Sequence, residues 1–231
     1  YGQLTGNRAL RFDLRNLGWI GKAAGEPRAM VVSARCEIQT IDDLISAEEP
    51  VAFSGAGIGS ASYADTRLLS VALGLNIKII PGYQGTESEM AMMRGEICGQ
   101  IGSQSSSQGF VDAGYGSYIL TIGGDMVGIP NAMDYAGDER ARQIVQLISN
   151  MAELGRVSAA PPNTPQEQLE ALRAAYRSAL EDPALLETAN RMGRPIEPAY
   201  GDDVRQLVVS ALDQTPESIQ IISRALNANA L

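Results

Sequence analysis

The sequence contains no histidine and only two lysines among its 231 residues. Without histidine, the Ser-His-Asp and Cys-His hydrolases are excluded, and so are the common histidine-containing zinc sites and the imidazole general base. Catalysis would have to depend on carboxylates, lysine or tyrosine. We therefore expect no histidine-dependent catalytic residue, no metal ligand and no cofactor.

Cysteine is also scarce, because Cys36 and Cys98 are the only two in the chain. Two cysteines are too few for a disulfide framework, and neither has a neighbour at the spacing of metal ligands. They form either one bridge or two buried, small apolar side chains. The spacing leaves both alternatives open.

Long apolar runs are missing as well. No stretch reaches the roughly 18 to 20 apolar residues that a membrane span needs, and the first residues do not have the pattern of a signal peptide. We expect a soluble chain, mature or truncated, without direct membrane insertion.

Positive charge is outweighed by negative charge, since the formal net charge is −9 and the calculated pI is about 4.6. Nucleic acids and anionic membrane surfaces are bound through clustered Lys and Arg, so neither is an expected partner. An anionic ligand would have to be bound by local dipoles and hydrogen-bond donors.

The most distinctive segment present is Ser-Gly-Ala-Gly-Ile-Gly-Ser at 54–60, between an apolar strand pattern at 51–53 and an amphipathic helix pattern at 61–73. Such a turn offers free backbone N–H groups at the positive end of a helix dipole, which favours an anion. The last serine can cap the helix. The candidate ligand contacts of this turn are Ser54, Ala56, Gly57, Ile58, Gly59 and Ser60.

Strand patterns alternate with helix patterns and occupy residues 30–33, 51–53, 76–80, 97–101 and 118–122. This alternation predicts an α/β fold with a parallel or mixed sheet covered by helices on both faces. The strand at 76–80 is apolar enough to be central. Thr86 and Glu89 fit a capping box at the start of the next helix, and 102–106 fits a polar turn.

The loops after three of these strands should meet at one edge of the sheet, where ligands of such folds bind. They add the candidate ligand contacts Tyr83, Gly85, Thr86, Ser103 and Gln104. None of these residues is charged, which fits a small carboxylate or polar anion. The serines at 103 and 105–107 have no neighbouring base and fit a hydrogen-bonding loop rather than a nucleophile.

Known nucleotide-binding motifs do not fit the turn at 54–60. The dinucleotide fingerprint is G-x-G-x-x-G, whereas the glycines here run G-x-G-x-G, and the P-loop lysine is missing. The alternative that remains at this level is a tight connection without a ligand.

Five segments occur in a characteristic order, namely TIDDLI at 40–45, FSGAGIGS at 53–60, IPGYQG at 80–85, MRGEI at 93–97 and APPNTP at 160–165. Together they resemble the receptor proteins of tripartite tricarboxylate transporters, also called Bug-type periplasmic solute receptors. The resemblance implies a type II periplasmic-binding fold of two lobes with a cleft. It also implies a periplasmic receptor that captures a small organic acid and presents it to membrane transporter subunits, without catalysis.

Carried onto this chain, the family pattern implies one α/β lobe at 29–123, which includes the glycine-serine turn, and a second, more helical lobe formed by 1–28 with 124–231. The family begins with a strand and a loop that nothing before Phe12 resembles. We therefore expect the lobe that opens the fold to be incomplete, without its N-terminal strand and loop.

The family pattern also suggests what the ligand is. Some members have an acidic residue at the position of Ser103 and Gln104, and its absence favours an uncharged or purely anionic ligand. Many members have histidine just after the glycine-serine turn, where this chain has Ser62 and Tyr63.

Two other classes of function stay open. One is an α/β enzyme acting on a phosphorylated or nucleotide-like ligand, with Tyr83 beside Glu87 or Glu89 as the one local pair. The other is an interaction or sensor module that binds no ligand.

Overall fold

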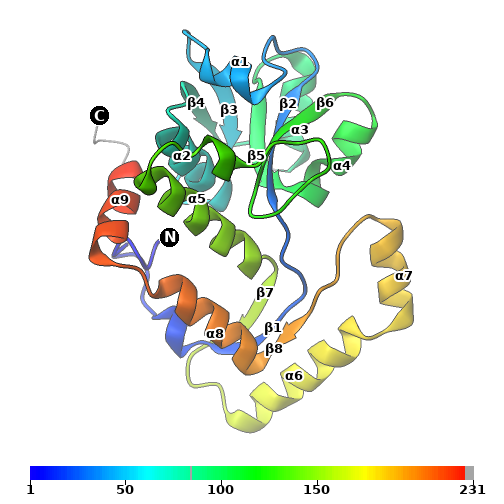
Figure 1. Cartoon of the computed structure of the whole chain (residues 1–231). Coiled ribbons are helices and arrows are strands. Elements are labelled where there is room, and N and C mark those ends of the chain that lie inside the picture. Colours follow the sequence, from blue (N-terminus) through cyan, green and yellow to red (C-terminus); the bar gives the residue numbers. More distant parts are fainter. Residues whose placement is uncertain (84, 227–231) are drawn as a thin grey trace.

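The computed structural model describes residues 1–83 and 85–226 and contains two β-sheets (Figure 1). Gln84, within the IPGYQG segment, lies outside the described residues. The strands of the five-stranded sheet are β2 (Arg28–Ser33), β3 (Val51–Gly55), β4 (Ile77–Pro81), β5 (Gly99–Ser103) and β6 (Gly116–Ile122). Those of the three-stranded sheet are β1 (Gly18–Lys22), β7 (Val157–Ala160) and β8 (Ala199–Tyr200).

The helices connect and cover these strands. Those within the five-stranded unit are α1 (Ile41–Ile45), α2 (Ala61–Leu73), α3 (Thr86–Arg94) and α4 (Gln104–Asp112). The later ones are α5 (Glu139–Leu154), α6 (Gln166–Leu180), α7 (Pro183–Arg191), α8 (Gly201–Leu212) and α9 (Pro216–Leu226), and the 3-10 turns are η1 (Leu14–Asn16) and η2 (Ala132–Tyr135). In Figure 1, α5 crosses the molecule between the two sheets.

The five-stranded sheet is mixed, in the order β4-β3-β5-β2-β6. β3 pairs in parallel with β4 and β5, while β2 runs antiparallel to β5 and β6. The predicted α/β fold with a mixed sheet is therefore confirmed, and the carboxyl ends of β3, β4 and β5 lie at one edge.

The expectation that strand 76–80 is central was wrong, because β4 is an edge strand. Its isoleucines are only half-buried, and Lys78 in its middle is exposed. A short apolar run does not distinguish a central strand from an edge strand that is covered on part of its surface.

Two helix starts differ from the predictions. Thr86 is the first residue of α3 rather than its cap, because Gly85, with a φ of 54°, makes the turn into the helix and no side chain caps it. The expected polar turn at 102–106 is instead the end of β5 and the start of α4 at Gln104. By contrast, Ser60 caps α2 as predicted, accepting a hydrogen bond from the Tyr63 N–H.

The chain passes between the sheets at two points that are hydrogen-bonded to each other. The N–H of Ala23 donates to the Arg156 carbonyl, and the N–H of Arg156 donates to the Ala24 carbonyl, both at 2.9 Å. A Cβ on Gly25 would lie 2.5 Å from the Glu153 carbonyl oxygen, so only glycine allows this approach. The two connections are thus fixed against each other.

The hydrophobic core extends from the five-stranded sheet to the helices that face it. Its fully buried members include Phe53, Leu68, Leu69, Ile148 and Ile222, from β3, α2, α5 and α9. Within the described residues, no helix is both long and apolar enough to cross a membrane.

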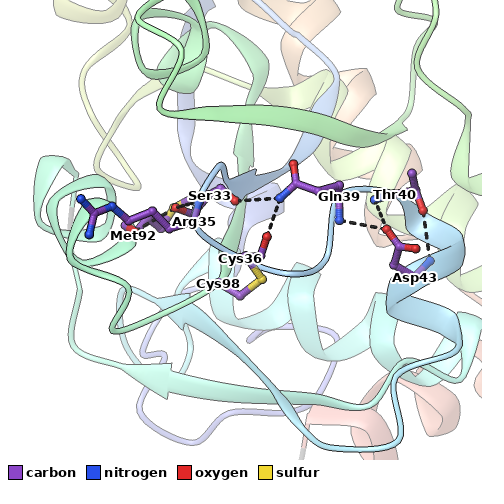
Figure 2. The surroundings of a disulfide bond; sticks show 8 residues. All are labelled: Ser33, Arg35, Cys36, Gln39, Thr40, Asp43, Met92 and Cys98. Atoms are coloured by element: carbon purple, nitrogen blue, oxygen red, sulfur yellow. Dashed lines mark hydrogen bonds between the residues drawn. A yellow bond between two sulfur atoms is a disulfide. The ribbon is translucent and has the colours of Figure 1, made fainter.

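Cys36 and Cys98 form a disulfide, which decides between the two alternatives left open by the sequence (Figure 2). Their Cα atoms are 5.3 Å apart, although 62 positions separate them in the chain. The Gln39 side chain donates to the carbonyls of Ser33 and Cys36, which fixes the loop that presents Cys36. The bridge joins the loop after β2 to the residue just before β5.

Candidate functional site

A cavity of about 410 Å³ lies at the edge of the sheet where β3 and β5 end. Six of the predicted ligand contacts line it, namely Ser54, Ala56, Tyr83, Gly85, Thr86 and Ser103. They come from the ends of β3 and β5 and from the loop and first turn of α3. The structure therefore brings together candidates from all three loops that the sequence analysis placed at this edge.

The apex of the glycine-serine turn lies outside this cavity. Gly57, Ile58, Gly59 and Ser60 are absent from its lining, and Ile58 is 79% exposed. Gly59 has a φ of 95°, a backbone conformation that side chains with a Cβ rarely adopt. The apex consequently faces solvent, and the cavity is bordered by the two ends of the turn.

The turn does not offer all its N–H groups to a ligand, which corrects the expectation of a free amide cup. The Ala56 N–H donates to Ser62 Oγ at 3.1 Å, and the Gly57 N–H donates to Ser60 Oγ at 3.3 Å. The two serine hydroxyls are also 3.2 Å from each other. Ser62, which lines the cavity, thus occupies the Ala56 amide, and Ser60 occupies the Gly57 amide.

Ser103 is positioned by Arg28, because β2 and β5 pair Arg28 directly with Ser103. The Arg28 guanidinium donates to Ser103 Oγ at 2.7 Å. With one lone pair occupied by this donor, the Ser103 hydroxyl keeps its own hydrogen for another acceptor. Ser103 can therefore donate a hydrogen bond into the cavity.

Arg28 also forms a buried ion pair behind the site. Its Nε is 3.1 Å from Asp65 Oδ2, and the two side chains are 15% and 3% exposed. The Tyr1 hydroxyl donates to Asp65 Oδ1 at 2.6 Å. Burial raises the pKa of Asp65, and the Arg28 charge and the Tyr1 hydrogen bond only partly oppose that rise.

A second cavity of about 520 Å³ adjoins the first, and both are lined by Arg194. The predicted contact Gln104 lines this second cavity. Beside it, Ser105 donates to the Glu26 carboxylate and accepts hydrogen bonds from Arg156 and Arg194. Burial works against the Glu26 charge, but the hydrogen bonds from Ser105 and Arg156 outweigh it and lower the pKa of Glu26.

Several lining residues were not among the predicted contacts, and Ser62, Glu89 and Arg194 are the ones that bear most on ligand binding. The sequence predicted that Glu89 helps to cap α3. Because the helix begins at Thr86 and has no side-chain cap, Glu89 does not have that role in the structure. Arg194 comes from the loop between α7 and β8, and no local pattern connects it with the sheet edge. Tyr83 was the expected partner of Glu87 or Glu89. In the structure, Arg94 lowers the pKa of Glu96, and a side-chain hydrogen bond from Tyr83 lowers the same pKa by a smaller amount.

Ligands of α/β folds bind at the carboxyl ends of parallel strands, and here a side chain from a second sheet unit also borders the cavity. Within the described residues, no group of acidic or cysteine side chains could hold a metal ion.

The sequence profile of the family described as "Tripartite tricarboxylate transporter family receptor" matches residues 7–226. The chain belongs to this family, and the resemblance noted from its five segments is confirmed.

Solved structures have the same fold at low sequence identity. MatC from Rhodopseudomonas palustris, solved with bound malate, has a TM-score of 0.68 at 16% identity, over 98% of this chain and 75% of that one. An R. palustris protein solved with adipate has a TM-score of 0.68 at 16% identity, over 93% of this chain and 72% of that one. The periplasmic binding protein BugD has a TM-score of 0.69 at 20% identity, over 90% of this chain and 69% of that one. Comparison with curated protein sequences gives no significant match.

Proposed function

We propose that this protein is an extracytoplasmic receptor that captures a small carboxylate for a tripartite tricarboxylate-type transporter. Family membership supports this function, and so do the malate and adipate found in two proteins of the same fold. In this proposal, residues 29–123 form one lobe and residues 1–28 with 124–231 form the other. The membrane subunits of the transporter are the expected partners.

The observation that carries the proposal is the chemistry of the 410 Å³ cavity. Its hydroxyl groups come from the predicted contacts Ser54, Thr86 and Ser103 and from further serines, and Arg194 adds a cation. Hydroxyl donors and a guanidinium are the groups that bind a carboxylate. The eleven predicted contacts remain proposals, with the cavity-lining ones as the stronger candidates.

A periplasmic location is supported by the Cys36–Cys98 disulfide. Disulfides persist in oxidising compartments such as the bacterial periplasm and are rare in the cytosol.

Titration with di- and tricarboxylates should raise the melting temperature of the protein. A ligand that binds only the folded state stabilises it by about 2.7 kcal/mol at a concentration of about 100 times Kd. Ser54→Ala should weaken binding about tenfold, because a hydroxyl that donates to a carboxylate contributes about 1.5 kcal/mol. Calorimetric titration of wild type and variant measures this loss.

Ser178→Ala is the matched control for that variant, because Ser178 is exposed on α6 and lies outside both cavities. It should bind the same acids with unchanged affinity. A melting temperature raised by nucleotides or sugar phosphates but by none of the carboxylates would contradict the proposed receptor and favour the enzyme alternative.

A further inference from the structure

The 410 Å³ cavity is lined by two ionisable side chains of opposite charge that do not neutralise each other. Glu89 comes from the first turns of α3, and Arg194 comes from the loop between α7 and β8. No ion pair within 4.0 Å joins them in the described part of the chain. The other lining residues carry no formal charge.

Glu89 is half-buried, and among the described residues its carboxylate has no ion pair. Burial raises the pKa of Glu89, and no nearby cation contributes to the shift. Because α3 begins at Thr86, the carboxylate does not reach back to cap the helix. A partly desolvated carboxylate of this kind favours a cationic partner.

Arg194 is also without a counter-ion among the residues described. Its guanidinium donates to the neutral Ser105 hydroxyl at 2.9 Å. The carboxylate nearest in this network, Glu26, is instead paired with Arg156. The positive charge of Arg194 therefore stays available to a ligand in the cavity.

We propose that the ligand is zwitterionic, with its carboxylate at Arg194 and a protonated nitrogen at Glu89. This proposal rests on the proposed receptor function and names the ligand class more closely. A dicarboxylate would place its second anionic group beside Glu89, where like charges repel each other. The proposal replaces the expectation of an uncharged or purely anionic ligand, which considered an acidic residue only at the position of Ser103 and Gln104.

Two matched ligand series test this assignment by calorimetric titration of the full chain. One series is ω-amino acids with two to six methylenes, and the other is dicarboxylates with the same numbers of methylenes. We expect wild type to bind at least one ω-amino acid more tightly than its matched dicarboxylate. Glu89→Gln should weaken the binding of that amino acid about tenfold, because the charged hydrogen bond to its nitrogen is lost. The same variant should bind the matched dicarboxylate more tightly, because the repulsion from Glu89 is removed.

Arg194→Gln should weaken the binding of both ligand series about tenfold, because every ligand in them has a carboxylate that the Arg194 guanidinium would bind. Glu87→Gln and Arg191→Gln are matched controls, because both residues are exposed, close in sequence to the tested ones, and outside the cavity lining. Both controls should leave affinities unchanged, and melting temperatures without ligand establish that each variant is folded.

Unaltered preference between the two series after Glu89→Gln would overturn the zwitterion assignment, while carboxylate binding itself would still support the receptor. If neither series binds, nor the di- and tricarboxylates of the earlier titration, the receptor function fails and the assignment fails with it.

Discussion

Arg28→Met is expected to lower the free energy of unfolding by about 3 to 5 kcal/mol. The substitution keeps much of the side-chain volume but leaves the Asp65 carboxylate, 3% exposed, without its cation. It also removes the donor to Ser103, so the β5 end of the cavity loses a positioning contact. Urea denaturation of wild type and variant at pH 7 measures the loss.

The cost of Arg28→Met should depend on pH. Burial already holds the pKa of Asp65 above its ordinary value, and removing Arg28 raises that pKa further. A carboxyl with a raised folded-state pKa binds protons more readily when folded, so the stability it contributes is lost as pH rises from about 4 through the folded pKa. The variant should therefore be closer to wild type at pH 5 than at pH 7.

Arg28→Lys and Asp65→Asn separate charge from packing. Arg28→Lys keeps a cation and should cost less than Arg28→Met. Adding Asp65→Asn to Arg28→Met should recover part of the loss and flatten its pH dependence. An equal cost of Arg28→Met at pH 5 and pH 7 would show that the ion pair does not control this stability.

The double variant Cys36→Ala/Cys98→Ala is expected to lose about 4 kcal/mol of unfolding free energy. The bridge closes a loop across 62 positions, and the chain-entropy relation gives about 4 kcal/mol for a loop of that length. Because Cys98 directly precedes β5, the loss should come with increased hydrogen exchange at the β5 amides that lead to Ser103.

Reductant provides the control for the disulfide. It should destabilise wild type by a similar amount and leave the double variant unchanged. If the double variant were as stable as oxidised wild type, the disulfide would not stabilise the protein by lowering the conformational entropy of the unfolded chain.

Local signals in the sequence predicted the fold well. The capping of α2 by Ser60 was predicted because it depends on neighbouring residues only. The start of α3 was predicted one residue too late. The sequence is compatible with either Gly85 or Thr86 as the residue before the helix, and in the structure Gly85, at positive φ, has that position. The position of β4 at the sheet edge depends on strand order, which periodicity does not contain.

The candidate site was predicted only in part, because part of it depends on contacts between distant segments of the chain. The ends of β3 and β5 were identified because parallel strands bring their carboxyl ends together. Arg28 escaped notice because it meets Ser103 through antiparallel pairing across 75 positions, and Arg194 because it arrives from another sheet unit. Ser62 satisfying the Ala56 amide is a matter of side-chain orientation, which the glycine pattern does not specify.

The two lysines have opposite surroundings, and the exposed one bears on how copies of the chain meet at high concentration. Lys22 is buried in β1 and bonded to Glu153. Lys78 lies mid-strand on β4, whose outer edge presents backbone groups that a strand of another molecule could pair with. A protruding charge, followed by Pro81 without an N–H at the end of the strand, opposes such edge-to-edge growth. A single exposed ammonium group on β4 therefore protects the protein from aggregation through this edge.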